Sequence, residues 1–279
     1  GDVYAQASGA VLDREEWTLP GDFAPTALED GGERDFSAST DTRWNLKAGW
    51  TPNATDEYAL SYIRADGRKD VPLHVSDTAS ARFWDWPYWD ISSLYFLSRT
   101  RLGEGLEVRT RGYLNTFDNL LAAYDDGSQS VQSLPRAFNS FYADEAWGGN
   151  VTLEAQLSAD ASLTGALFFR RDRHDERQDG FVRVPASGAP FDNRAYSEPS
   201  QISEEDAWSA ALEYKQTLSQ TLDLVLGASH DWTQLREAAD INVVVSGATL
   251  ASASVSLVPV VYPARDLSAW NGQGALIWR

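Results

Sequence analysis

The sequence predicts an all-β protein: an antiparallel, up-and-down membrane β-barrel segment of about ten strands. Three observations predict this fold class. Apolar and polar residues alternate along most of the chain, and the spacing of an amphipathic helix is nearly absent. Long and short links between these segments alternate strictly along the chain. Tryptophan and tyrosine recur near both ends of several segments, on the apolar side.

The alternating segments define the strands. In residues 43–50, for example, Trp44 and Trp50 fall on one side and Lys47 on the other. The lengths of the segments suit tilted membrane strands of roughly 9–11 residues. The predicted strands are 3–12, 43–50, 57–64, 91–100, 106–115, 148–157, 162–171, 207–217, 221–232 and 267–279.

The links between these strands indicate how the sheet is arranged. Short links are rich in turn-forming residues, as in TPNATD, RLGEG and SADA. An alternation of long and short links is typical of an outer-membrane barrel with short periplasmic turns and long extracellular loops, whereas a Greek-key sandwich has no reason to keep it. The long links are 13–42, 65–90, 116–147, 172–206 and 233–266.

Aromatic residues lie near opposite ends of single strands and share the parity of the apolar residues. Two belts of rings bracketing an apolar band are expected where rings lie at the level of lipid head groups, and the polar side would then line a lumen. The alternative is that these rings are ordinary strand core, because rings are common in any sheet. The ring pairs are Trp44 and Trp50, Trp208 and Tyr214, and Trp270 and Trp278.

One uncharged run, 241–263, is long enough for a transmembrane helix. Its serines at 252, 254 and 256 alternate with small and apolar residues, and it is rich in valine. We therefore expect a β-extension of an outer loop, with a hairpin around the sequence SGAT.

Composition excludes several classes of function. The 279 residues include 23 Lys and Arg against 41 Asp and Glu, a formal net charge of −18. Such a balance argues against a nucleic-acid partner, because phosphate binding needs a basic face. The absence of cysteine excludes disulfides and thiolate metal sites. Because the chain contains no methionine and begins with Gly1, we expect it to be a piece of a longer chain or a mature segment.

No catalytic motif is found, so the protein is not expected to be an enzyme. The charged run RRDRHDER at 170–177 is interpreted as a solvated strand end entering a loop. The three histidines lie far apart, and Asp125–Asp126–Gly127 lacks the spacing of a calcium loop. Neither a cofactor nor a metal site is predicted.

Aromatic clusters in two long links are the candidate ligand site. The stretch RFWDWPYWD, Arg82–Asp90, has Pro87 at its centre, which argues against the interior of a regular strand. We expect its distal rings to meet a ligand at the barrel rim and Trp89 to anchor at the lipid boundary. The alternative is that these rings only pack the loops against one another. The predicted ligand-binding residues are Trp84, Trp86, Tyr88, Phe138, Phe141 and Tyr142.

Four stretches together resemble a known family. They are RFWDWPYWDISSLYFLSRTRLG, YLNTFDNLLAAYDDGS, RAFNSFYADEAWGGNVTLEAQLS and WNGQGALIWR. The chain resembles the barrel region of TonB-dependent outer-membrane receptors over roughly residues 1–279, through strand and loop phrases rather than a short motif.

The resemblance implies a function and partners. Such receptors sit in the outer membrane of Gram-negative bacteria, surrounded by lipid, and import a scarce small-molecule nutrient such as a ferric siderophore. A plug domain links them to the TonB energy-coupling complex. This chain shows neither a plug nor a TonB box, so residues 1–279 are expected to form one partial transmembrane barrel domain with two unpaired edges.

Two other interpretations remain open at this stage. One is a diffusive porin or a small complete barrel. The other is a secreted carbohydrate-binding β protein, in which RFWDWPYWD would be a platform for sugar stacking. A soluble protein must cover its apolar faces with a second layer, whereas a barrel leaves them to lipid.

Overall fold

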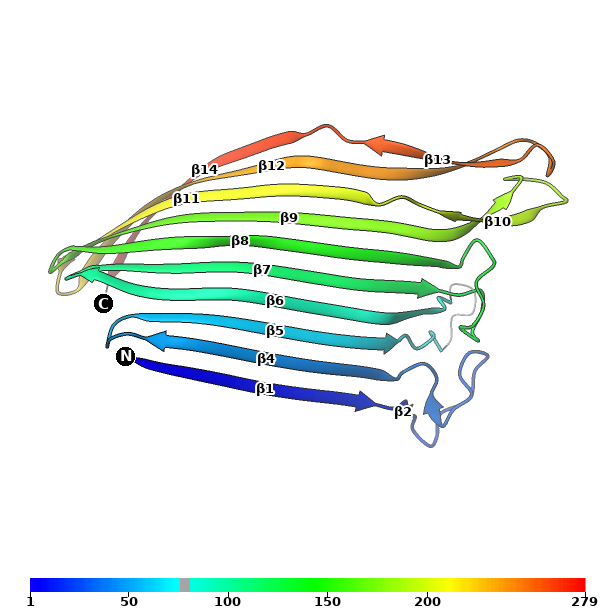
Figure 1. The fold of residues 1–279 in the computed structure, drawn as a ribbon, viewed down its shortest axis with the longest axis horizontal. Helices are drawn as coiled ribbons and strands as arrows, with labels where there is room; N and C mark the ends of the chain where they lie inside the picture. The colour runs from blue at the N-terminus through cyan, green and yellow to red at the C-terminus, as the bar shows by residue number, and fades with distance from the viewer. Residues whose placement is uncertain (76–80, 279) are drawn as a thin grey trace.

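A computed structural model describes residues 1–75 and 81–278, and one large antiparallel sheet dominates it (Figure 1). All ten predicted strands are present in their predicted order. The long strands are β1 (Asp2–Arg14), β4 (Ser39–Thr51), β5 (Glu57–Asp70), β6 (Trp84–Gly103), β7 (Leu106–Ala123), β8 (Phe138–Ser158), β9 (Ala161–Val184), β11 (Gln201–Ser219), β12 (Leu222–Ser246) and β14 (Arg265–Trp278). The short ones are β2 (Trp17–Thr18), β3 (Glu33–Arg34), β10 (Asp192–Ser197) and β13 (Ser254–Val261).

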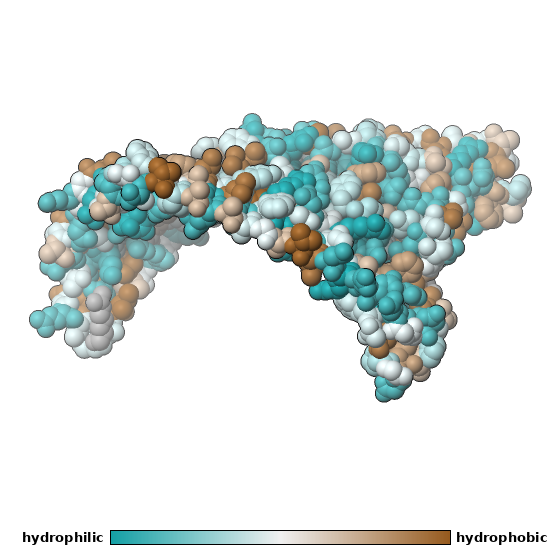
Figure 2. Space-filling view, turned by 60° about the horizontal axis from the view of Figure 1, so that its bottom comes forward, coloured by the Kyte–Doolittle hydropathy of each residue, from teal (hydrophilic) through white to brown (hydrophobic). Residues whose placement is uncertain are grey.

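Successive long strands pair with each other, so the topology is up-and-down as predicted. The sheet has twelve strands, with β1 at one edge, while β13 and β14 pair with successive parts of β12 at the other. Among the described residues, β1 does not pair with β14, and the sheet is open. Figure 2 shows the molecule as an arch with a hollow beneath it.

The tight connections all lie at one end of the sheet. They include Glu104–Gly105 and Ala159–Asp160, as the sequence predicts. Gly105 has a φ of +69°, a conformation that favours glycine. The long connections, with β2, β3 and β10, lie at the other end (Figure 1). We call these the turn end and the loop end.

The strands extend further toward the loop end than predicted. The link expected at 116–147 shrinks to residues 124–137, because β7 continues to Ala123 and β8 begins at Phe138. The charged run 170–177 is likewise part of β9 rather than the entry to a loop. In these loop-end extensions apolar and polar residues no longer alternate, although the backbones of β8 and β9 remain paired. The strand ends were therefore missed in the sequence.

The sheet has an apolar and a polar face. Residues directly opposite in antiparallel strands share a face, so the register defines the apolar face by rows that cross the strands. One such row contains Leu60, Phe96, Gly112, Gly149, Phe169 and Trp208. Large apolar side chains on this face are solvent-exposed, and Leu167 reaches 64%.

Rings follow both borders of the apolar face, as the predicted belts require. At the turn end, Trp50 stacks on Tyr58 with 5.6 Å between ring centroids. Toward the loop end, a chain of rings runs across four strands, with centroid separations of 5.0, 4.3 and 6.0 Å. We call the apolar region between the two borders the lipid band. The second border consists of Trp147, Phe169, Trp208 and Trp232.

The expectation that Pro87 keeps RFWDWPYWD out of a regular strand is wrong in part. β6 begins at Trp84 and continues through Pro87. The proline is accommodated by a break in register between Asp85 and Tyr88 opposite β7, matched by a break between Gly67 and Lys69 on β5. A β-bulge of this kind tolerates a residue without a backbone N–H.

A small apolar core lies at the loop end, where Leu73, Phe83 and Ala137 are buried beside the end of β7. Burial, with Asp85 beside it, raises the pKa of the Tyr124 hydroxyl, which donates to Asp85, to about 12. The Asp125 carboxylate accepts hydrogen bonds from the backbone N–H groups of Ser133 and Leu134, both at 2.9 Å. The loop 124–137 is thus tied down, and part of the aromatic cluster, Phe83, packs loops as the alternative interpretation proposed.

The uncharged run 241–263 forms the end of β12 and β13, joined by a turn at 247–253, which confirms the expected hairpin. Gly247 in that turn has a φ of +93°. Within the described ranges, no helix has the length and apolar character needed to cross a membrane.

We predict that Gly149→Ala destabilises the sheet. A Cβ at Gly149 would lie 2.4 Å from the carbonyl oxygen of Arg111, whereas one at its cross-strand partner Gly112 would meet nothing within 4 Å. The clash should cost about 1–3 kcal/mol, as overpacking does in other proteins. Thermal unfolding in detergent micelles measures the change, with Gly112→Ala as the matched control. Equal midpoints for the two variants would contradict the close approach.

Candidate functional site

The register places the predicted ligand-binding rings of β6 on both faces. Trp86 pairs with Lys69 and Trp84 with Ala123, and both partners lie on the polar face. Tyr88 pairs with Leu120 on the apolar face, on the other side of the bulge. The extra residue at the bulge changes the parity of the strand, so Trp86 and Tyr88, on either side of Pro87, face opposite ways.

The rings of β8 divide in the same manner. Phe138 and Tyr142 lie on the polar face, where the ring of Phe138 is 6.2 Å from that of Trp84. Phe141 lies on the apolar face, with the guanidinium carbon of Arg177 3.8 Å from its ring centroid. Four of the six predicted residues, Trp84, Trp86, Phe138 and Tyr142, therefore share the polar face.

A cavity of 590 Å³ lies on the polar face near the loop end. Trp89 is part of its lining, so the expectation that Trp89 anchors at the lipid boundary is wrong: strand parity puts it with Ile91 and Ser93. Its ring centroid is 4.8 Å from that of Phe117 and 5.8 Å from that of Trp86. We call this the rim cavity.

Charged side chains line the rim cavity and also lie beside it, where Lys69 contacts the lining residue Trp89. The ammonium of Lys69 is 5.1 Å from the ring centroid of Trp89, a cation–π distance. Asp144, Arg170 and His174 line the opposite wall. Rings beside groups of both charges can hold an organic molecule that carries its own charges.

His174, in the lining of the rim cavity, lies between two carboxylates. Its Nδ1 is hydrogen-bonded to the Asp144 carboxylate, and its Nε2 lies 3.3 Å from a carboxylate oxygen of Glu176. Burial opposes a charge on the ring, but the two carboxylates outweigh burial and raise the pKa of His174. The ring centroid of Tyr142 is 5.9 Å away. Neither His174 nor Asp144 was singled out from the sequence, because their meeting depends on the pairing of β8 with β9.

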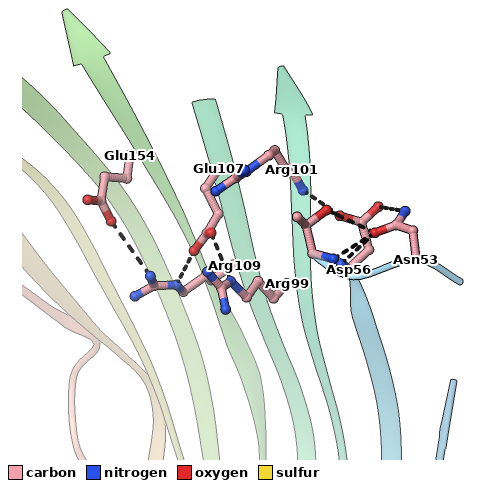
Figure 3. Close-up of polar contacts among 8 residues, drawn as sticks. Asn53, Asp56, Arg99, Arg101, Glu107, Arg109 and Glu154 are labelled. Atoms are coloured by element: carbon pink, nitrogen blue, oxygen red, sulfur yellow. Dashed lines mark hydrogen bonds and ion pairs between the residues drawn. The ribbon is translucent and has the colours of Figure 1, made fainter. Parts of the chain in front are cut away.

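A second polar cluster lies on the same face at the turn end (Figure 3). The Glu107 carboxylate accepts hydrogen bonds from Nε of Arg99 at 2.8 Å and Nε of Arg109 at 2.7 Å. In the adjoining turn, Asp56 accepts from the backbone N–H of Arg101 at 2.9 Å, a bond that lowers the pKa of Asp56. The polar face thus carries charged groups from the loop end to the turn end.

Glu29, Asp30 and Asp35 form the one cluster, within the described ranges, that has the proximity needed for a metal ion. Glu29 is buried, and its oxygens already accept from the guanidinium of Arg34 and from the backbone N–H groups of Gly31 and Asp35. Despite the cost of burial, these bonds hold the pKa of Glu29 below its usual range. The cluster is explained by the packing of the first long loop.

The open, up-and-down sheet with two ring borders has the fold of part of a β-barrel wall, and solved structures share it. One is a copper transporter, OprC: TM-score 0.66 at 13% identity, over 97% of this chain and 38% of the other. Another is the FrpB iron transporter from Neisseria meningitidis (F3-3 variant), which matches with a TM-score of 0.66 at 12% sequence identity. The match covers 100% of this chain and 41% of the transporter chain. A third is the ferric yersiniabactin uptake receptor FyuA from Yersinia pestis, which matches with a TM-score of 0.61 at 12% sequence identity. The match covers 98% of this chain and 39% of the receptor chain.

These comparisons establish the fold. The resemblance to the barrel of TonB-dependent receptors is confirmed at that level, and the chain spans about two fifths of the length of these structures. Compared by sequence, the chain matches no family model and no curated protein.

We predict a pH-dependent contribution of His174 to stability. Because its pKa in the folded protein is raised above the ordinary 6.5, the stabilisation is complete below pH 6.5 and is lost as the pH rises through the raised value. The side chain is 42% exposed, so the effect should stay below ~1 kcal/mol.

The measurement is the thermal unfolding midpoint in micelles between about pH 5 and pH 8, the range in which histidine titrates. In His174→Gln, the excess stability on the acid side should disappear. The half-buried His230, on the apolar face, supplies the control variant His230→Gln. Identical pH profiles for wild type and His174→Gln would refute the carboxylate pairing.

Proposed function

We propose that this chain is part of an outer-membrane transporter that captures a small nutrient at the cell surface and passes it along the polar face. The rim cavity is the observation that carries this proposal. It lies at the loop end, which is extracellular in barrels of this kind, and its rings face the polar side. Its rings and charges suit capture of a solute, and no arrangement of nucleophile and base is required for that role.

Within this proposal, a ferric siderophore is the preferred ligand class. Two of the similar structures are described by their titles as an iron transporter and a ferric yersiniabactin receptor. Iron chelators of this type are organic molecules with polar and charged groups, and aromatic faces beside Lys69 and Arg170 offer such molecules both stacking and charge pairing.

The location and partners follow from the same proposal. Residues 1–279 would form a partial barrel domain in the outer membrane of a Gram-negative bacterium, with lipid against the lipid band. The open edges would be closed by further strands, because unpaired backbone groups cost several kcal/mol each in hydrocarbon. Import would draw on the TonB complex through a plug domain carried outside this chain.

The remaining alternatives differ in observable ways. A diffusive porin could have the same fold, but it would show no saturable binding of the nutrient at the rim cavity. A secreted carbohydrate-binding protein is disfavoured by the exposed rings and aliphatic side chains of the lipid band, such as Trp208 at 42% and Leu212 at 53%, which the sheet does not cover with a second layer.

We predict that Trp86→Ala with Trp89→Ala weakens ligand capture. Each ring is expected to contribute roughly tenfold to affinity through stacking and burial. The matched control is Tyr88→Ala with Phe141→Ala, which removes two rings from the other face, one on β6 and one on β8. Binding and uptake of radiolabelled iron, supplied as a panel of ferric hydroxamate and catecholate complexes, measure the effect. If both double variants lose affinity equally, or if neither loses affinity, the ligand does not bind on the polar face and the proposal is wrong.

We also predict heat-modifiable migration on a detergent gel for the intact outer-membrane protein that contains this chain. Closed barrels stay folded in detergent until they are boiled, because each strand is hydrogen-bonded on both sides. Recovery in the soluble fraction, with the same migration before and after boiling, would support a secreted protein instead.

A further inference from the structure

A slot in the wall of the lipid band is the feature that the proposed function leaves unexplained. It is a cavity of 420 Å³ on the apolar face, and its lining is almost entirely apolar. The row of side chains that crosses the sheet here is filled by large groups except in the middle, where β7 and β8 present glycine. We call this cavity the glycine slot.

The floor of the slot is the cross-strand pair Gly112 and Gly149. Neighbouring strands are about 4.8 Å apart, so two adjacent glycines open a gap that a single one would not. Phe96 on β6 and Phe169 on β9 stand in the same row and form its two side walls. At the turn-end side, Val151 and Leu167 close the next row.

The other end of the slot meets a polar layer. The next row toward the loop end contains Trp147, whose ring centroid is 5.8 Å from the guanidinium carbon of Arg171. The guanidinium donates to Asp206 from Nε at 2.6 Å and from Nη2 at 2.9 Å. The slot therefore begins at the ring border, to which its lining residues Phe169 and Trp208 belong, and it runs from there toward the turn end, as the hydrocarbon chain of a lipid does beneath its head group.

Resting on the outer-membrane location proposed above, we propose that the glycine slot is a binding site for one acyl chain of a membrane lipid. An unfilled slot would forfeit dispersion contacts with its walls. A chain lying in it touches the glycine floor and both phenylalanine walls, whereas a chain elsewhere on the band touches only one surface. Because lipid tails are as apolar as leucine, this extra contact, not the hydrophobic effect, makes the slot preferred over the rest of the wall.

The glycine at position 112 gives the proposal a clean variant. A Cβ there would meet nothing within 4 Å, so the new side chain in Gly112→Leu starts into open space and is expected to fill the slot. The matched control is Gly165→Leu, on the same face and outside the slot, where a Cβ would meet only Leu212, at 3.8 Å. A second test variant, Phe96→Ala, removes a wall and leaves the floor intact.

The experiment reconstitutes the intact outer-membrane protein in vesicles of phosphatidylethanolamine and phosphatidylglycerol, doped with a phosphatidylglycerol that carries a diazirine midway along one acyl chain. Folding of each variant is checked by heat-modifiable migration. After illumination, labelled peptides are mapped by mass spectrometry. We expect labelling of Val151 and Leu167 to exceed that of Leu226, elsewhere on the band, by about fivefold, which corresponds to ~1 kcal/mol.

In Gly112→Leu and Phe96→Ala the excess should fall to the level of Leu226, and in Gly165→Leu it should stay. Uniform labelling of the band in the wild type, or an excess that survives Gly112→Leu, would overturn the site. A second occupant is tested through Val151→Cys, a unique cysteine in this cysteine-free chain. Rapid oxidation to a disulfide-linked dimer in the vesicles would show that a second copy covers the slot and would also overturn the proposal.

Discussion

Backbone hydrogen bonding between neighbouring strands is the constraint on which the rest of this structure depends. Within the described ranges, the buried apolar residues are few, and those at the loop end, such as Leu73 and Phe83, are set apart from the sheet faces. The sheet therefore has no central core to fix its shape. The register that pairs the backbone N–H and C=O groups therefore also decides which side chains lie on the apolar face and which lie on the polar face.

The register also explains how one chain makes two unlike surfaces. The apolar face needs only area and rings at its borders, whereas the polar face holds specific contacts, such as the pairing of His174 with Asp144. Pro87 lies at a bulge that supplies rings to both faces. Tyr88 lies on the apolar face, while Trp86 and Trp89 lie on the polar face. The glycine pair at 112 and 149 is the counterpart on the apolar face: its effect lies in the side chains that are missing.

Periodicity was sufficient to predict the strands between the two ring borders from the sequence, because alternation is strongest where one face of the sheet is apolar and the other polar. It failed beyond the ring borders. There both faces are polar, so the stretch from Phe138 to Trp147 reads as loop although it is paired residue by residue with β7 and β9. The rings of the candidate site were found by composition, but their division between faces was not, since a bulge leaves no periodic signal. The partnership of Asp144 with His174 depends on residues 30 apart in sequence and on an alignment of strands that local patterns do not specify.

The second edge of the sheet is built from two separate segments, and they differ as templates for a further strand. β13 carries Pro259 opposite Ile241, whose own backbone N–H donates to the Gln201 side chain and not to β13. The proline nitrogen, which has no hydrogen to donate, therefore belongs to the free edge. β14 has no proline between Arg265 and Trp278 and offers an uninterrupted row of donors and acceptors. A further strand can therefore pair with β14 along its whole length, at the level of the lipid band. Pairing with β13, nearer the loop end, would be interrupted at Pro259.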